Sequence, residues 1–329
     1  MASGPAKVGI VGAGNISRLH LEGMSRHPER VELVALSDPD EATLKARAAE
    51  FGIPRTYRDL GGMLAEEHLD AAIVCTPTQV RKQVVLPLIE AKIPTFCEKP
   101  FAETYPEAAE VERAARQAGV ALAINQNFRR HFTFDVARQV LDRGELGKPL
   151  HLVQSAAYMR HDIGWRLDRK RYVMAVMSIH WFDGYRYLLR DEPETVYCRG
   201  LNSPATAGGE DTAVSVVLQF SRGTVVSLSE SFSSFTRQNA CTLDCESGGL
   251  VMDYEKAVEV RSNGARVEHE NPFDKAGATY YLLDDLMLAV QDGRAPETSA
   301  ADNLKSMRIM EAAYRSLAEN RVVGVEEIG

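Results

Sequence analysis

The sequence contains few cysteines, and they are scattered along the chain. Five occur in 329 residues: Cys75, Cys97, Cys198, Cys241 and Cys245. An odd number at wide spacing is unlike the paired framework of small secreted domains. A zinc site would need further ligands close to Cys241 and Cys245, and none lie there. We therefore expect no disulfide framework, no metal site and a reducing cytoplasm as the compartment.

Long apolar runs and an excess of basic residues are also missing. No run reaches the roughly 20 residues of a membrane-spanning helix. The opening segment has no charged region followed by an apolar stretch, so we expect no signal peptide. Lys and Arg number 38 against 46 Asp and Glu, which gives a formal net charge of −8. This balance argues against nucleic acids and membranes as partners.

Strands and helices alternate in the first third of the chain. Apolar runs such as "KVGIVG" and "DAAIVCT" are separated by segments rich in helix formers. Continuous apolar strands between helices indicate a parallel sheet that is covered on both faces. The expected fold over residues 1–124 is an α/β Rossmann domain with a doubly wound parallel sheet.

A different pattern begins near Asn125. Most strand-like segments beyond it alternate apolar and polar residues and are joined by turn signals. We expect residues 125–329 to form a C-terminal α+β domain for substrate binding and oligomerisation. Its large sheet should be open-faced and mostly antiparallel, and the two closing helices can pack back on the first domain. An uncovered sheet face favours a homo-oligomer, and the alternative is a face that meets water.

A glycine loop lies between the first strand and the first helix. Gly12-Ala13-Gly14 follows the strand directly, and Ser17 fills the third small position of the pattern. The pyrophosphate of a dinucleotide must approach backbone N–H groups at the helix N-terminus, and a Cβ would block it. The strand–turn–helix context therefore predicts dinucleotide binding.

Asp38 ends the second strand, in "ALSDPD". Its carboxylate can accept hydrogen bonds from the ribose hydroxyls of the adenosine and would repel a 2′-phosphate. No arginine stands immediately beside it, so NAD is preferred over NADP. The alternative is that Asp38 only caps the helix that starts near Pro39.

Glu98-Lys99-Pro100 ends another strand of the expected parallel sheet. Ligands of such sheets bind outside the carboxyl ends of the strands, so the Lys99 amine should reach the nicotinamide crevice. Proline disfavours a helical conformation for Lys99 and ends ladder pairing. The ammonium can lower the pKa of an alcohol or relay a proton, while Glu98 can orient the lysine or a ribose. The alternative is an ordinary surface pair.

A helical segment further along carries His180 and Asp183, in "SIHWFD". Because they are three residues apart, they share a helix face. An imidazole beside a carboxylate is a natural proton acceptor. The alternative is a half-buried histidine that packs against core tyrosines.

Together these motifs resemble the Gfo/Idh/MocA family of oxidoreductases. The segments that carry the resemblance are Gly12–Ser17, "CTPTQVR" (Cys75–Arg81), "CEKPFA" (Cys97–Ala102), "SIHWFD" (Ser178–Asp183) and the closing stretch from residue 301. The resemblance covers nearly the whole chain. It implies a Rossmann domain followed by an open-faced sheet domain, assembled as a homodimer or homotetramer through the C-terminal sheet.

The resemblance also implies roles for single residues. Lys99 matches the catalytic lysine, and His180 matches the histidine proposed as acid and base. The implied cofactor-binding residues are Gly12, Gly14, Asn15, Ile16, Asp38, Thr76, Pro77, Glu98, Lys99 and Asn127. The implied substrate-binding residues are Lys99, Arg129, Tyr158, Trp165, Arg166, His180 and Asp183.

Three positions depart from the family pattern. Val176 stands where an aspartate is common, Ser178 replaces a glycine, and Arg81 replaces a frequent histidine. Arg81 and Arg166 could favour an anionic or acid sugar, or either could be a surface cation.

The predicted activity is NAD-dependent oxidation of a sugar, cyclitol or sugar-acid carbinol. One alternative is an NAD-dependent enzyme that cleaves a glycosidic bond through transient oxidation. Another is a non-catalytic regulator that binds a dinucleotide, although such a protein has little need of Lys99 or His180.

Overall fold

The apolar strands of the first third form a parallel sheet. In the part of the chain that is described, they pair in the order β3-β2-β1-β4-β5-β6, and each pair is parallel. The strands are β1 (Ala6–Val11), β2 (Val31–Ser37), β3 (Arg55–Tyr57), β4 (Ala71–Val74), β5 (Thr95–Cys97) and β6 (Leu122–Ile124). The order reverses between β1 and β4, which is where a doubly wound sheet accepts a ligand.

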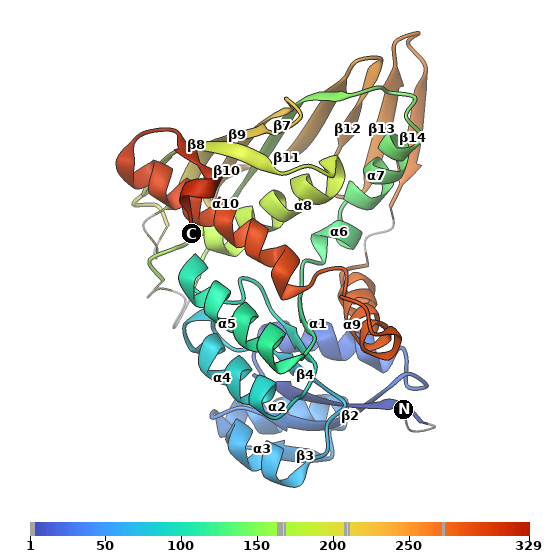
Figure 1. Cartoon of the computed structure of the whole chain (residues 1–329), viewed down its shortest axis with the longest axis vertical. Coiled ribbons are helices and arrows are strands. Elements are labelled where there is room, and N and C mark those ends of the chain that lie inside the picture. Colours follow the sequence, from blue (N-terminus) through green and yellow to red (C-terminus); the bar gives the residue numbers. More distant parts are fainter. Residues whose placement is uncertain (1–3, 163–166, 168, 207–208, 210, 272–273) are drawn as a thin grey trace. The chain divides into compact units, whose positions relative to one another are not determined.

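Helices cover both faces of this sheet. They are α1 (Asn15–Ser25), α2 (Glu41–Phe51), α3 (Leu60–Glu66), α4 (Thr78–Glu90), α5 (Tyr105–Ala118) and α9 (Lys275–Asp292). Leu21 of α1 and Leu286 of α9 pack with Ile10 and Ile73 in one apolar core. Met63 of α3 lies against Gly9 on the opposite face, and α4 packs beside α5 (Figure 1). The expected doubly wound fold is confirmed.

The computed structural model describes residues 4–162, 167, 169–206, 209, 211–271 and 274–329. The chain divides into two units, drawn in Figure 1. Unit 1 contains residues 1–127 and 274–305, and unit 2 contains residues 128–273 and 306–329. Helix α9 therefore belongs to unit 1, where Ser299 also forms a β-bridge with Ala123.

Unit 2 is built on a mixed, mostly antiparallel sheet, as expected. Its order, over the residues described, is β14-β13-β12-β11-β7-β10-β9-β8-β15, and within it only β7 and β10 pair in parallel. The strands are β7 (Pro149–Met159), β8 (Pro193–Leu201), β9 (Ala213–Phe220), β10 (Val225–Ser231), β11 (Ser233–Cys245), β12 (Gly248–Met252), β13 (Lys256–Arg261), β14 (Arg266–Glu270) and β15 (Val323–Gly324).

Helices of unit 2 pack on one face of that sheet (Figure 1). They are α6 (Phe128–His131), α7 (Phe134–Asp142), the π-helical turn η2 (Met174–Ser178), α8 (Ile179–Leu189) and the part of α10 (Ala300–Glu319) from Ser306 on; the 3-10 turn η3 (Val325–Glu327) follows β15. Along β9, Val216 and Leu218 are buried, whereas Val217 between them is 42% exposed. The second face of the sheet thus presents apolar side chains to solvent in the single chain.

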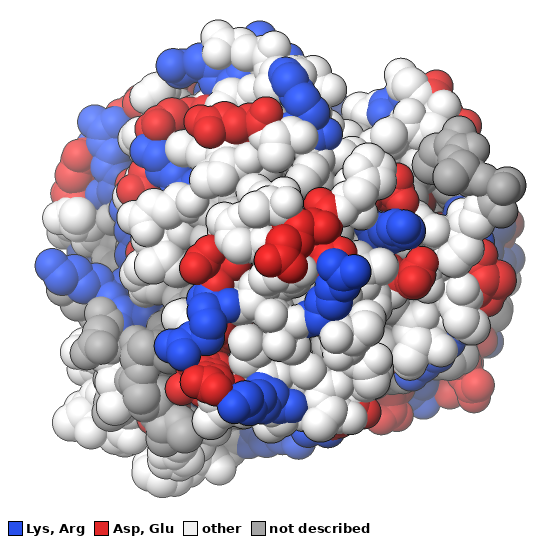
Figure 2. Space-filling model, turned by 90° about the horizontal axis from the view of Figure 1, so that it is seen from below, with Lys and Arg blue, Asp and Glu red and all other residues white. Residues whose placement is uncertain are grey.

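Charges of both signs are mixed on the face of the molecule shown in Figure 2. Opposite charges also pair at close range, as at Glu41, which contacts Lys45 at 2.5 Å and Arg58 at 3.1 Å. Exposed pairs of this kind contribute little to stability. Within the described ranges, no helix is long and apolar enough to cross a membrane.

A buried aspartate holds the turn that leads into α8. Asp211 accepts hydrogen bonds from the backbone N–H of Tyr172 at 2.7 Å and of Met174 at 3.0 Å, and from the Tyr314 hydroxyl at 3.1 Å. Burial raises the pKa of Asp211 to about 6, although these hydrogen bonds lower it in part. The backbone at the start of η2 is therefore bound by a carboxyl group, that of Asp211, whose protonation changes near pH 6.

Asp211 should make the stability of unit 2 depend on pH. Its folded-state pKa of about 6 exceeds the ordinary value of 3.8. The stabilisation it gives is thus complete below pH 3.8 and is lost as the pH rises through about 6. Relative to Asp211→Asn, the wild type should lose on the order of 1–3 kcal/mol of unfolding free energy between pH 4 and pH 7. Urea unfolding of both proteins checks this, and a pH-independent difference would contradict it.

Candidate active site

The glycine loop joins β1 to α1 and approaches the loop after β4 closely. Gly12 has a φ of +102°, a conformation that favours glycine. A Cβ at this position would lie 2.8 Å from the backbone carbonyl carbon of Cys75. Only glycine therefore fits here without moving the backbone after β4.

Asp38 holds the same loop from the end of β2. Its Oδ2 accepts the backbone N–H of Ala13 at 2.7 Å, and its Oδ1 accepts that of Asp40 at 2.9 Å. The residue that caps α2 is Asp40, which accepts the N–H of Thr43 at 2.7 Å. The alternative reading of Asp38 as only a helix cap is therefore wrong. Each Asp38 oxygen accepts one of these bonds and has capacity for another.

The N-terminus of α1 fits an anionic group. Among the residues that the structure describes, nothing lies within 4 Å of the place where a Cβ of Gly14 would stand, and no side chain caps the helix there. Asn15 and Ile16 form the first turn, whose N–H groups and dipole favour a negative charge. Ser17 is buried and donates its hydroxyl to the Gly14 carbonyl at 2.7 Å, so a serine satisfies the third small position.

Arg47 lies beside this loop, and the sequence did not reveal this contact. Its Nε donates to the Ala13 carbonyl at 3.3 Å, and its Nη1 pairs with Glu50 at 2.5 Å. Arg18 pairs with the same Glu50. A guanidinium nine residues beyond Asp38 carries no local signal, because only the packing of α2 brings it to the loop.

Glu98 is buried at the end of β5, in a polar cluster inside unit 1. Its Oε1 accepts hydrogen bonds from His20 Nε2 at 2.9 Å and from Asn125 Nδ2 at 2.7 Å. Burial raises the pKa of Glu98, but the His20 and Asn125 contacts and the Lys99 charge outweigh it and hold the pKa at about 2. Glu98 is thus an anion at neutral pH, directly before Lys99.

Lys99 is half-buried, and its peptide bond to Pro100 is cis. Arg81 of α4 joins the loop after β4 to the loop after β5, because its guanidinium donates to the carbonyls of Thr76 and Pro100. Arg81 is only 5% exposed. The reading of Arg81 as a surface cation is therefore wrong, because its guanidinium binds backbone at the ends of β4 and β5.

Three further cofactor candidates lie in unit 1. The Thr76 hydroxyl is buried and has no hydrogen-bond partner in the described part of the chain, so it can serve a ligand. Pro77 precedes the first turn of α4. Asn127 is buried, and its Nδ2 donates to the Thr279 hydroxyl on α9 at 3.0 Å.

The remaining candidates belong to unit 2. His180 stands in the first turn of α8 and is 5% exposed. Its ring stacks on Phe128, with centroids 3.9 Å apart and planes inclined by 8°. Tyr158 lies near the end of β7, and its ring packs 5.1 Å from that of Phe232. Trp165 and Arg166 fall outside the described residues.

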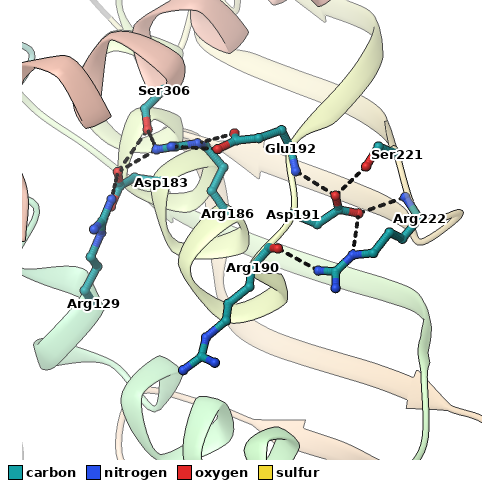
Figure 3. Close-up of polar contacts among 9 residues, drawn as sticks. All are labelled: Arg129, Asp183, Arg186, Arg190, Asp191, Glu192, Ser221, Arg222 and Ser306. Atoms are coloured by element: carbon teal, nitrogen blue, oxygen red, sulfur yellow. Dashed lines mark hydrogen bonds and ion pairs between the residues drawn. The ribbon is translucent and has the colours of Figure 1, made fainter.

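Asp183 is engaged by a buried polar network (Figure 3). Arg129 donates to both of its oxygens, at 2.7 Å and 2.8 Å, and Ser306 donates at 2.9 Å. Arg186 lies 3.5 Å from the same carboxylate and forms a second two-bond pair with Glu192, at 2.6 Å and 3.0 Å. Arg129 and Asp183, which the sequence assigned to substrate, therefore bind each other in unit 2.

Glu230 of β10 is a further buried acid that the sequence did not reveal. It accepts hydrogen bonds from the Ser178 hydroxyl and from Trp181 Nε1, the latter at 3.0 Å. Ser178 and Trp181 are three residues apart and share one face of the helix. Ser178, which replaces the usual glycine, thus binds the sheet through Glu230. Position 176, where an aspartate is common in the family, carries valine.

Comparison with family models covers both units. Residues 6–126 match the "Oxidoreductase family, NAD-binding Rossmann fold", and residues 134–251 match the "GFO/IDH/MocA C-terminal domain". The chain belongs to the Gfo/Idh/MocA family. The expected class, an NAD(P)-dependent dehydrogenase, is confirmed, and unit 1 contains the family's NAD-binding Rossmann fold.

Relatives of this family member match over almost its whole length. The "Uncharacterized oxidoreductase YrbE" of Bacillus subtilis is 30% identical and spans 97% of this chain and 96% of its own. A D-apiose dehydrogenase of Paraburkholderia graminis is 28% identical, over 98% and 90%. A myo-inositol 2-dehydrogenase of Thermotoga maritima is 26% identical, over 98% and 99%.

A solved structure shares the fold. An oxidoreductase from Agrobacterium radiobacter, in complex with NAD+, L-tartaric acid and magnesium, has a TM-score of 0.91 at 22% identity. The match covers 98% of this chain and 99% of that one.

Removing the Asp183 carboxylate should destabilise unit 2, because the buried Arg129 would lose its partner. We expect Asp183→Ala to lower the free energy of unfolding by about 3–5 kcal/mol. The control is Glu268→Ala, which breaks an exposed pair with Lys256 (2.9 Å) in the same unit. That change should cost less than about 1 kcal/mol. Urea unfolding compares the two, and equal costs would show that the buried network contributes nothing.

Proposed function

We propose that the protein oxidises a CH–OH group of a sugar, cyclitol or sugar acid, with NAD as hydride acceptor. The observation that carries the proposal is the buried Glu98 anion directly before Lys99, at the end of β5 in an NAD-binding Rossmann unit. Relatives named for D-apiose and myo-inositol favour a polyhydroxylated substrate. The loops around residues 158–170 would decide which polyol is accepted.

The residues of unit 1 fit a dinucleotide that lies across the carboxyl edge of the sheet. Asp38 would hold the adenosine ribose, and Gly14 with the first turn of α1 would hold the pyrophosphate. The nicotinamide half would then lie toward the ends of β4 and β5. There the Thr76 hydroxyl, which has no partner among the described residues, and the Glu98 carboxylate can bind it.

Proton transfer would fall to residues of both units. Bound nicotinamide supplies the site to which the hydride of the carbinol carbon goes. His180, whose ring is fixed against Phe128, takes the hydroxyl proton as general base. The Lys99 ammonium stabilises the negative charge that develops on the same oxygen. Holding these groups in fixed positions would provide much of the rate acceleration.

We also propose a role for each domain and a form of subunit assembly. Residues 1–124 would bind the cofactor, and residues 125–329 would bind substrate and oligomerise. The uncovered face of the unit 2 sheet exposes Val153, Val217 and Val251, which are apolar side chains suited to a contact between subunits. A homodimer or homotetramer in the cytoplasm is the form we propose.

Lys99→Ala should abolish most turnover and leave cofactor binding nearly unchanged. We expect kcat to fall by about 10²–10⁴-fold, because the developing alkoxide loses its cation. Wild type is first screened for NAD+ reduction over sugars, inositols and aldonates, and the best substrate is used for the variant. Lys45→Ala, on the 74% exposed side chain of Lys45, is the control and should change nothing.

Two outcomes would contradict the assignment. Unchanged turnover of Lys99→Ala would remove the lysine from the chemistry. Product formation without NADH accumulation would indicate the glycoside-cleaving alternative.

Asp38 should enforce the preference for NAD. Its carboxylate would repel a 2′-phosphate, and the nearby Arg47 is already paired with Glu50. We expect wild type to bind NADH at least about tenfold more tightly than NADPH, a difference of about 1.4 kcal/mol. Asp38→Ser should reduce this ratio severalfold. Fluorescence titration measures both ligands without any substrate, and equal wild-type affinities would refute the preference.

A further inference from the structure

Three buried polar side chains from separate segments meet at the carboxyl edge of the unit 1 sheet. His20 comes from α1, Glu98 follows β5, and Asn125 follows β6. Their exposed fractions are 2%, 5% and 2%. The backbone fixes two of them, since Glu98 N–H donates to the Val74 carbonyl and Asn125 N–H donates to the Cys97 carbonyl. The cluster is related to the proposed chemistry of Lys99 only by its location, because Glu98 directly precedes Lys99.

The two hydrogen bonds to Glu98 are distributed unevenly. His20 and Asn125 both donate to Oε1, and in the described part of the chain no hydrogen bond reaches Oε2. A carboxylate oxygen accepts about two hydrogen bonds, so Oε1 is saturated. An ionised oxygen that is nearly buried is costly without a donor. The arrangement therefore presents Oε2 as an acceptor for a group that the protein does not supply.

The His20 ring is held rigidly and offers a single donor. A carboxylate only accepts hydrogen bonds, so Nε2 must donate to Glu98. Nδ1 is buried and has no partner among the described residues, so a second N–H on the ring would be unpaired. The ring also packs edge-on to Phe96, with centroids 5.6 Å apart. Its contribution is thus a fixed, directed hydrogen bond.

We propose that His20 and Asn125 are positioning residues that hold Glu98 so that its Oε2 binds the nicotinamide nucleoside half of the cofactor. The inference rests on the proposed placement of NAD across the sheet. Asp38 and Glu98 follow β2 and β5, which lie on opposite sides of the reversal between β1 and β4. A dinucleotide with its adenosine at Asp38 must therefore bring its other half toward Glu98.

The test separates the two halves of the cofactor. NADH and ADP are titrated against the full chain by calorimetry, since ADP lacks the nicotinamide nucleoside. We expect His20→Leu to weaken NADH binding by about tenfold or more, because a hydrogen bond to a charged group is lost. ADP binding should change by less than about twofold. His20→Gln retains a donor near the Nε2 position and should restore NADH affinity to within about threefold of wild type.

A matched control removes the effect of packing. Leu21 is buried next to His20 on the same helix, and Leu21→Ala should lower the melting temperature while leaving the NADH-to-ADP ratio unchanged. If His20→Leu does not fold, Asn125→Ala removes the second donor and should shift the same ratio in the same direction.

Three results would overturn the inference: an equal loss of NADH and ADP affinity, no loss at all, or no rescue by glutamine. Failure of the proposed function would be seen separately. In that case wild type would oxidise no polyol, while the selective loss of NADH affinity would persist.

Discussion

The carboxyl ends of parallel strands meet at one edge of a sheet, and the chemistry of unit 1 depends on this constraint. Gly12, Asp38, Thr76, Glu98 and Asn125 are far apart in sequence, but each lies within two residues of the carboxyl end of a strand of the same sheet. The crossovers bring them to a common edge, where the strand order reverses beside β1. The order of the strands thus provides the edge at which the glycine loop, Asp38 and Glu98 come together.

Buried charges then decide the local geometry in both units. In unit 1, Arg81 binds backbone carbonyls at the ends of β4 and β5, and the Glu98 anion accepts hydrogen bonds from His20 and Asn125. In unit 2, Asp183 accepts hydrogen bonds from Arg129 and Ser306, and Asp211 anchors the turn before α8. Such groups are costly to bury without hydrogen-bond partners, so they tolerate few alternative arrangements.

Local signals explain what could be predicted from sequence. The buried strands and the Gly12 loop are visible because apolar runs and a glycine before a helix are short-range patterns. Contacts that depend on helix rotation are not visible. His20 meets Glu98 across 78 residues, and helix spacing grouped Asp183 with His180 although Arg129, 54 residues away, takes its oxygens. Strand β14, "RVEHE", cannot be recognised from the sequence, because its charged, exposed residues lack an apolar alternation.

The claim on which the account depends is that Lys99 and His180 act on one carbinol above the nicotinamide ring. A crystal structure of the complex with NAD+ and an oxidisable polyol, or with its inert analogue, tests this most directly. The account predicts that Lys99 Nζ and a ring nitrogen of His180 lie within about 3.2 Å of the same substrate oxygen. It also predicts that the nicotinamide nucleoside contacts Glu98. A substrate oxygen that either side chain fails to reach, or a nicotinamide bound away from Glu98, would contradict it.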